Sequence, residues 1–252
     1  MRNRTPQIGS LGRTLATLEA VVRDAGASNV STLARANGVP IATAHRQVAT
    51  LVAEGFLTRV GHGRHMAGPR LLGLLHCLDE KQIVTCTAEP LLASLASRLG
   101  TIVQLGTFEN DMVTYRIKAG HGANALFTRI GMQLEAYCSG MGKVLLAHLT
   151  DTERAAYLAG GPFVPLTART ITDPAKLAEE LAKVRANGFA IDDGEIDDSL
   201  FCMAVPLRNA VGEVLAAISV SQNRLTASRI ADDQLLPLLQ STARQIEIET
   251  FG

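Results

Sequence analysis

Two groups of residues in this 252-residue chain carry side chains that suit binding chemistry. The first group lies on a predicted helix over residues 41–53, where four polar residues recur at i, i+3, i+4 and i+7 and share one face. They are Thr43, Arg46, Gln47 and Thr50. Arginine and glutamine each form paired hydrogen bonds to base edges in the major groove of DNA. The stripe therefore predicts contacts to duplex DNA, and the alternative interpretation is a solvated helix face.

Further basic groups follow directly after this helix. Arg59 and Arg64 lie in a predicted hairpin over residues 56–67, where they would reach backbone phosphates or the minor groove. Two roles stay open. Arg46 contacts either a base or a phosphate, and His45 is either a phosphate donor or a solvent-exposed histidine.

The second group of candidate residues lies in the C-terminal half. The run Ser139-Gly140-Met141-Gly142 opens a predicted helix over residues 139–149, and the free N–H groups of a helix N-terminus suit a carboxylate or phosphate. Ser219 and Ser221 are two residues apart on a predicted strand, so their hydroxyls point to the same face. With Met141 and Cys202 as an apolar wall, this mixture suits a small acid with an apolar or aromatic body. The alternatives are packing glycines and solvated serines.

The elements around the first group predict a winged helix-turn-helix. Helices over 11–24 and 32–36 precede residues 41–53. Ser31 is expected to cap the second helix, and Asn37-Gly38 to end it. The predicted hairpin, with strands at 56–60 and 65–67, would form the wing.

The charge distribution agrees with this interpretation. The whole chain is formally neutral, but residues 1–70 hold nine arginines against Glu19, Asp24 and Glu54, which leaves +6 there and −6 in the remainder. A basic module on an acidic body fits a polyanionic partner.

A mostly apolar helix is predicted over residues 69–87, between the basic module and the body. It is apolar on more than one side, which favours burial against its own body or a partner chain. Because helix-turn-helix proteins commonly bind two half-sites, we expect a dimer.

The remainder predicts an α+β fold, an antiparallel sheet flanked by helices. The expected strands are 101–108, 112–118, 125–130, 189–191, 203–207 and 214–221. The expected helices are 89–99, 139–149, 151–159, 175–186 and 226–249, the last kinked at Pro237.

Together these segments resemble an IclR-type transcriptional regulator over essentially the whole chain. The residues that carry the resemblance are 31–57 (STLARANGVPIATAHRQVATLVAEGFL), 139–147 (SGMGKVLLA), 169–172 (RTIT), 184–189 (VRANGF), 192–195 (DDGE) and 216–221 (AAISVS). The resemblance implies a winged helix-turn-helix domain at 1–68, a linker helix at 69–87 and a GAF-like effector-binding domain at 88–252. It also implies binding to a palindromic operator as a homodimer, often as a dimer of dimers.

The resemblance further implies an effector pocket on one side of the C-terminal sheet. Its lining residues would be Gly140, Met141, Asp192, Leu200, Cys202, Ser219 and Ser221. Relatives often carry a smaller residue at the position of Met141, so this methionine would narrow or soften the pocket. The expected effector is a small organic acid. Whether the regulator represses or activates is left open.

Other classes of protein are not expected. No apolar run approaches the roughly 20 residues of a membrane span, and no secretory signal is recognisable, so we expect a cytoplasmic protein. Four scattered cysteines without a C-x-x-C pair and an acidic run without EF-hand spacing predict no metal site or cofactor. The alternative function is a hydrolase with Cys202 or Ser139 as nucleophile. Because no G-x-S-x-G motif occurs, we expect no catalytic residue and no enzyme.

Overall fold

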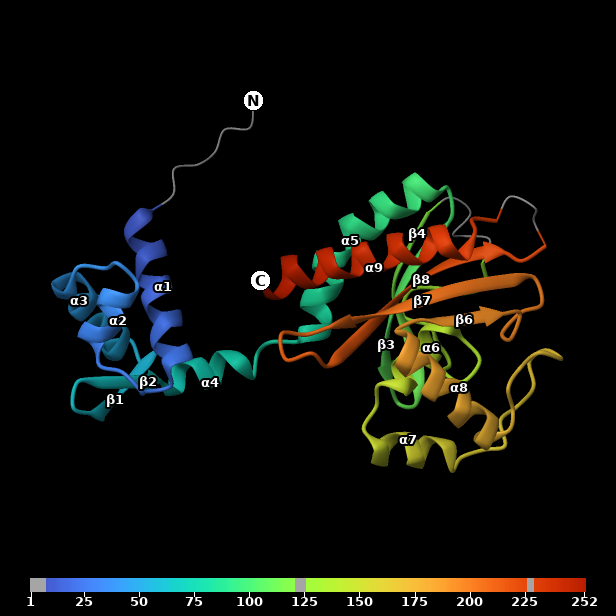
Figure 1. The fold of residues 1–252 in the computed structure, drawn as a ribbon, viewed down its shortest axis with the longest axis horizontal. Coiled ribbons are helices and arrows are strands. Elements are labelled where there is room, and N and C mark those ends of the chain that lie inside the picture. The colour runs from blue at the N-terminus through green and yellow to red at the C-terminus, as the bar shows by residue number, and fades with distance from the viewer. Residues whose placement is uncertain (1–7, 121–125, 226–228) are drawn as a thin grey trace. The chain divides into compact units, whose positions relative to one another are not determined.

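The computed structural model describes residues 8–120, 126–225 and 229–252 (Figure 1). The chain divides into two compact units, residues 1–78 and 79–252. None of the described helices is both long enough and apolar enough to cross a membrane.

The N-terminal unit is a winged helix-turn-helix, as predicted. Its elements are α1 (Gly9–Asp24), α2 (Val30–Ala36), α3 (Ile41–Ala53), β1 (Leu57–Gly61), β2 (Arg64–Ala67) and α4 (Pro69–Leu75). One face of each of the first three helices is apolar, and these faces form a small core around Val21, Ala34 and Val48. The antiparallel strands β1 and β2 form the wing. His62 and Gly63 join them with φ of 51° and 70°, the left-handed conformation that a two-residue hairpin loop requires.

Two local predictions for this unit are wrong. Asn29, not Ser31, caps α2, because its side-chain oxygen accepts a hydrogen bond from the Thr32 N–H at 2.9 Å. The helical spacing of residues 41–53 also predicts Ile41 on the buried apolar face of α3, but Ile41 is 38% exposed, because it lies at the first position of the helix, beyond the core.

The predicted single linker helix over 69–87 is also wrong. Helix α4 ends at Leu75, and α5 runs from Glu80 to Leu99 without the break expected near residue 88. Asp79 starts α5 by accepting hydrogen bonds from the N–H groups of Lys81 and Gln82 at 3.0 and 3.3 Å. The boundary between the two units therefore lies within the predicted linker.

Helix α5 continues through Pro90 because its buried face is uninterrupted. Val84, Ala88, Leu92 and Leu95 are all buried at helical spacing, whereas Pro90 lies on the exposed side.

The C-terminal unit contains one six-stranded sheet in the order β5-β4-β3-β8-β7-β6, with every neighbouring pair antiparallel. The strands are β3 (Ile102–Glu109), β4 (Met112–Ala119), β5 (Gln133–Glu135), β6 (Ala190–Asp193), β7 (Leu200–Arg208) and β8 (Val214–Asn223). The α+β prediction is confirmed. The strand predicted at 125–130 is wrong: residues 126–130 form a loop, residue 125 lies outside the described residues, and the strand that pairs with β4 is 133–135.

Helices cover both faces of this sheet (Figure 1). Helices α5 and α9 (Asp232–Phe251) lie side by side on one face. Helix α6 (Gly140–Ala147) packs on the other face, followed outward by α8 (Pro174–Asn187) and α7 (Asp151–Leu158). Each layer has its own apolar core. The terminal helix begins at Asp232 rather than at 226, where residues 226–228 lie outside the described residues, and it runs through Pro237 without interruption.

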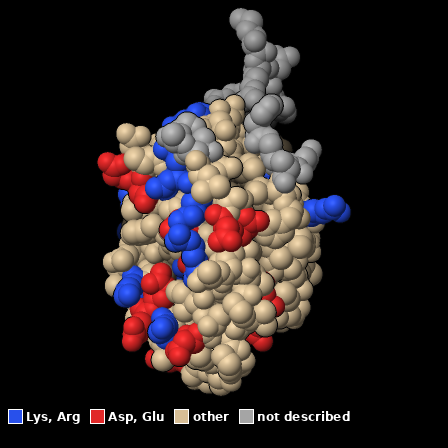
Figure 2. All heavy atoms as spheres, turned by 90° about the vertical axis from the view of Figure 1, so that its right-hand side faces the viewer, with Lys and Arg blue, Asp and Glu red and all other residues tan. Residues whose placement is uncertain are grey.

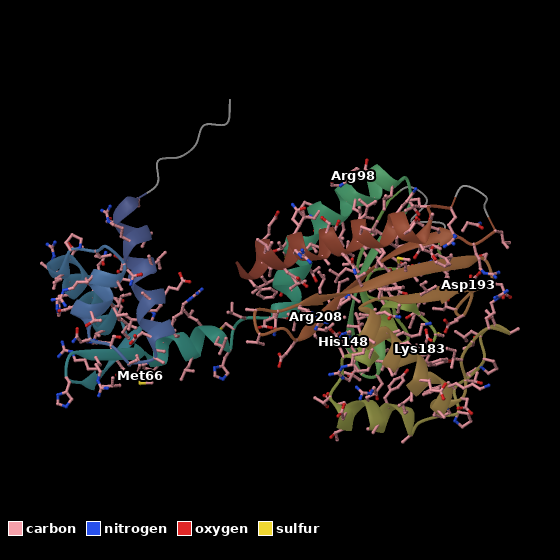
Figure 3. The ribbon with its side chains drawn as sticks, in the orientation of Figure 1. Met66, Arg98, His148, Lys183, Asp193 and Arg208 are labelled. Carbon is pink, nitrogen blue, oxygen red and sulfur yellow. The ribbon has the colours of Figure 1, made fainter. Side chains whose placement is uncertain are left out.

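A half-buried histidine, His148, links the end of α6 to β7 (Figure 3). His148 Nδ1 lies 2.8 Å from the Val144 carbonyl, and Nε2 lies 3.0 Å from the Arg208 guanidinium. Because an arginine only donates, Nε2 must accept and Nδ1 must carry the hydrogen. Burial lowers the pKa of His148, which agrees with this neutral form.

Candidate functional site

The polar stripe on α3 is present, but its four residues are not equally free. Arg46 and Thr50 are exposed, whereas Thr43 and Gln47 are half-buried. The Gln47 side-chain oxygen accepts a hydrogen bond from the Thr17 hydroxyl of α1 at 2.8 Å. Paired hydrogen bonds to adenine need both the oxygen and the nitrogen of the amide. Arg46 is therefore the member of the stripe best placed to contact a base.

The other residues predicted to contact DNA also differ in their exposure and in their hydrogen bonds. Arg59 is exposed on β1, while Arg64 on β2 is half-buried and its Nε is buried without a hydrogen-bond partner. His45 Nε2 lies 3.3 Å from the Ser31 hydroxyl. The wing is joined to the start of α2 through the Val30 N–H, which donates to the Gly63 carbonyl at 3.3 Å. This contact fixes the wing relative to α2 and α3 within the same unit.

The N-terminal unit also carries the positive charge. Residues 1–78 have a formal charge of +6 and residues 79–252 of −6, because residues 71–78 add no charged side chain. On the face of the C-terminal unit that Figure 2 shows, basic and acidic side chains are intermixed. An attraction for a polyanion therefore belongs to the winged helix-turn-helix unit.

All seven residues predicted for the pocket line one cavity in the C-terminal unit. They are Gly140, Met141, Asp192, Leu200, Cys202, Ser219 and Ser221. The antiparallel register brings them together: Asp192 faces Cys202, Cys202 faces Ser221, and Ser219 faces Gln104 on neighbouring strands. The cavity is narrow, with about 20 Å³ open to the centre of a water molecule, which is room for about one water.

Sequence reasoning missed further residues of this cavity. Gln104 and Tyr115 contribute from β3 and β4, and residues 126–128 close one side. A signal for Gln104 was present, since it is a polar residue within the apolar run of β3 and is 3% exposed. Its register with Ser219, which the sequence does not show, places it at the cavity.

The polar groups of the cavity form a short hydrogen-bonded chain. The Gln104 amide donates to the Thr128 hydroxyl at 2.8 Å and accepts from the Ser221 hydroxyl at 3.1 Å, and Ser221 lies 3.2 Å from the Cys202 sulfur. Ser219 lines the cavity and makes no side-chain hydrogen bond with the described residues. Burial raises the pKa of the Cys202 thiol, which keeps this sulfur protonated.

The two glycines that open α6 differ in function. A side chain at Gly142 would lie 2.0 Å from the Ala136 carbonyl oxygen, whereas one at Gly140 would meet the nearest atoms at 3.5 Å. Gly142 therefore permits close packing of backbone against backbone. Gly140 lines the cavity, and Ser139 caps the helix by accepting the Gly142 N–H at 3.1 Å.

A buried charged cluster lies behind the cavity. Lys143 on α6 is 1% exposed, forms an ion pair with Glu195 and lies 3.6 Å from Glu180. The Glu195 N–H donates to Asp192 Oδ1 at 2.7 Å, while Asp192 Oδ2 and Glu195 Oε2 are buried and have no hydrogen-bond partner in the described part of the chain. Burial raises the pKa of Asp192 to about 6 and that of Glu195 to about 7, against the opposing effect of Lys143.

Both the helix-turn-helix unit and the C-terminal unit match models of known protein domains. The model of the IclR helix-turn-helix domain matches residues 10–61, and that of the bacterial transcriptional regulator IclR C-terminal domain matches residues 75–248. The chain belongs to the IclR family of transcriptional regulators. Members of this family bind DNA through the helix-turn-helix domain, and the C-terminal IclR domain is associated with small-molecule effectors.

Individual IclR-family relatives span nearly the whole chain. The Pca regulon regulatory protein of Pseudomonas putida is 30% identical over 96% of this chain and 84% of its own length. The repressor BlcR of Agrobacterium tumefaciens has a TM-score of 0.75 at 29% identity, covering 96% and 97% of the two chains. An IclR homologue from Microbacterium hydrocarbonoxydans, solved with 4-hydroxybenzoate, has a TM-score of 0.62 at 28% identity, covering 96% and 98%.

The hydrolase alternative has no support from these IclR-family relatives. Within the described residues, the Ser139 hydroxyl serves as a helix cap, and His148 is engaged by Val144 and Arg208 instead of a nucleophile. His121, another histidine that a hydrolase could use as a base, lies outside the described residues. In the part of the chain that the structure describes, no three metal-ligating side chains are grouped as a metal would require.

Proposed function

We propose that this IclR-family regulator binds a palindromic operator through α3 and the wing, and that a small organic acid in the C-terminal cavity controls this binding. The main support for the proposal is that the seven residues implied by the family resemblance line a single cavity in the same chain as a basic winged helix. An effector that binds two states of the regulator with different affinity shifts the population between them.

The DNA contacts proposed here start from the exposed residues. Arg46 would contact a base in the major groove, and Arg59 a phosphate from the wing. Thr43, Thr50 and His45 would add contacts along α3. The Gln47 oxygen already accepts a hydrogen bond from Thr17, and the Arg64 Nε is buried. Their proposed role is therefore to support the position of α3 and the wing, with the Gln47 amide nitrogen and the Arg64 terminal nitrogens available to donate.

The effector class follows from the chemistry of the cavity. The Ser219 hydroxyl, the Gly140 and Met141 N–H groups at the start of α6, and the sulfur atoms of Met141 and Cys202 offer both polar and apolar contacts. Aromatic acids are the first candidates, because a relative was solved with 4-hydroxybenzoate. Since the cavity holds about one water, binding of such an acid requires movement of flexible groups such as Met141.

Dimerisation is proposed from the apolar residues that the N-terminal unit leaves exposed. Leu72, Leu74, Leu75 and Leu78 are 49–60% exposed along and just after α4, and Leu11 and Leu15 are 54–55% exposed on α1. Single exposed leucines are ordinary, but a group of this size indicates an interaction surface. A dimer would present two copies of α3 to two half-sites, and two dimers would form the expected tetramer. We place the protein in the cytoplasm, where its DNA target is found.

A thermal-shift titration tests the effector part of the proposal. Full-length protein is titrated with 4-hydroxybenzoate, benzoate and propionate, because a ligand that binds the native state raises its apparent stability. We expect a saturable rise of the unfolding temperature that the Ser219→Ala variant reduces. Ser199→Ala, a serine outside the cavity lining, is the control. No rise with any acid would contradict an acid effector, and an unchanged rise in Ser219→Ala would place the site elsewhere.

A further inference from the structure

The cavity proposed for the acid has an unexpected charge. Among the described residues that line it, Asp192 is the one carboxylic acid, and neither lysine nor arginine is present. The nearest buried cation, Lys143, lies behind the cavity, paired with Glu195 and close to Glu180. Among the described residues, the lining of the cavity proposed for an anion therefore contains a carboxylate and no unpaired cation.

Asp192 itself has an unmet hydrogen-bonding position. Its side chain is 0% exposed, Oδ1 accepts the Glu195 N–H, and Oδ2 has no hydrogen-bond partner among the described residues. The titratable and charged groups around it come from β4, the start of α6, β6 and the loop after it, and β7. They are Tyr115, Cys138, Lys143, Asp193, Glu195 and Cys202.

None of these groups supplies a free positive charge to the cavity. Tyr115, Cys138 and Cys202 are neutral, because burial raises the pKa of each. Asp193 is half exposed and faces Arg224 and Arg169. A carboxylate that enters the cavity therefore meets the charge of Asp192 in a site of low dielectric constant.

We infer that an organic acid enters this cavity together with one proton from solvent, and that Asp192 carries this proton in the complex. In the complex the Asp192 Oδ2–H donates a hydrogen bond to the acid's carboxylate, and Oδ1 continues to accept the Glu195 N–H. The balance is one proton taken up per acid bound, with no covalent bond formed or broken in the ligand. This inference depends on the proposed function, because it concerns the same cavity and the same class of ligand.

Two observations support the linkage. Burial already holds the pKa of Asp192 near 6, so little free energy is needed to protonate it near neutral pH, and a nearby anion raises that pKa further. The unpartnered Oδ2 also gives the proton a defined position. Glu195 is a weaker candidate, because its carboxylate is paired with Lys143 and does not line the cavity.

Isothermal titration calorimetry of the full-length protein tests this inference. Benzoate, 4-hydroxybenzoate and propionate are each titrated between pH 5.5 and 8.0, in pairs of buffers with different heats of ionisation, which reports the number of protons taken up. We expect uptake to approach one proton at pH 8 and to fall towards zero below pH 6. The dissociation constant should rise about tenfold per pH unit above pH 7, as linkage to a single proton requires.

Variants assign the proton to one residue. Asp192→Asn imitates the protonated carboxyl, so it should bind the acid at pH 8 about as tightly as the unaltered protein does at pH 5.5, without proton uptake. Asp193→Asn is the matched control and should keep the pH dependence. His121→Gln should also keep it, which separates Asp192 from a histidine that titrates in the same range.

The outcomes are distinct. Acid binding without proton uptake in the unaltered protein overturns the inference and leaves the proposed function standing. Proton uptake that persists in Asp192→Asn, or disappears in His121→Gln, also overturns it. If none of the acids binds at any pH, both the effector proposal and the linkage are refuted. Proton uptake in the unaltered protein is measured independently of whether Asp192→Asn folds.

Discussion

Asp192 and Glu195 are three residues apart, both buried, and close to the same lysine. The pKa of Asp192 in the folded protein is about 6, above its ordinary value of 3.8, because burial disfavours the charged form. The resulting stabilisation is present below pH 3.8 and is lost as the pH rises through about 6. The pKa of Glu195 is likewise raised, to about 7, so its stabilising contribution is lost as the pH rises through about 7. Keeping these two carboxylates buried therefore lowers the free energy of unfolding of this protein at neutral pH.

Replacing Asp192 by Asn should remove its part of this cost. The variant should exceed the unaltered protein in free energy of unfolding by about 1–3 kcal/mol at pH 8, and the gap should narrow by about 1 kcal/mol at pH 5. Urea unfolding of the C-terminal unit at the two pH values measures it. Asp193→Asn, a half-exposed neighbour, should show a gap under about 1 kcal/mol at both pH values. An Asp192→Asn gap that does not depend on pH would contradict the raised pKa.

Arg46 is the residue on which sequence-specific DNA recognition is proposed to depend. Arg46→Ala should weaken operator binding by about 1–3 kcal/mol if the guanidinium pairs with a base. Fluorescence anisotropy with a labelled duplex at fixed salt measures the change. Arg98→Ala removes the same charge from α5 of the other unit and should leave the affinity nearly unchanged. Equal losses in both variants would indicate a general effect of charge and argue against a base contact.

Among the secondary-structure elements, most helices could be predicted from the periodic spacing of apolar residues. The register in which the strands pair could not be predicted from the sequence. Helix α3 runs over 41–53 as expected, because its apolar residues recur at helical spacing and Pro40 precedes it. The cavity residues were identified by resemblance, and two serines two apart could be placed on one face from spacing alone. Gln104 was missed because its proximity to Ser219 depends on the pairing of β3 with β8, a contact between residues more than a hundred positions apart.

The wrong linker prediction has a local cause. The apolar composition of residues 69–87 concealed the cap at Asp79, and the buried face of α5 continues past residue 88. The short strand β5 was missed because Gln133–Glu135 lacks the β-branched residues typical of strands. Its pairing with Met112–Thr114 stabilises it instead.

The two glycines at the start of α6 should differ in how much they matter for stability. Gly142→Ala should lower the free energy of unfolding of the C-terminal unit by about 2 kcal/mol or more, because its new methyl group meets backbone atoms of Ala136 that cannot move cheaply. Gly140→Ala should change it by less than about 1 kcal/mol, since its nearest neighbours lie at ordinary contact distance. Chemical unfolding of the two variants compares them. Similar values would show that α6 is not pressed against Ala136.

At the scale of the whole molecule, the proposal requires two copies of the chain. The exposed leucines along α4 are the surface on which this depends. Leu72→Asp combined with Leu75→Asp should shift the protein towards monomers, because each charge would be buried without a partner in the interface. Analytical ultracentrifugation measures the shift. Val211→Asp, at a residue 77% exposed in the C-terminal unit, is the control. A double variant that stays dimeric would place the interface elsewhere.

The division of charge also belongs to this scale. The neutral chain separates into a basic DNA-binding unit and an acidic effector unit, so the attraction for DNA is expected to be strongly dependent on salt. The acidic unit would repel the same polyanion, which favours contact through the winged helix alone.

Effector-controlled DNA binding can be measured by titrating the full-length protein into a labelled duplex from upstream of its own gene. The titration is repeated with increasing benzoate or 4-hydroxybenzoate, and with a scrambled duplex of equal length. We predict tighter binding to the upstream duplex than to the scrambled one, and an affinity that changes at least fivefold as the acid saturates. Equal affinity for the two duplexes, unaltered by any acid, would contradict the account.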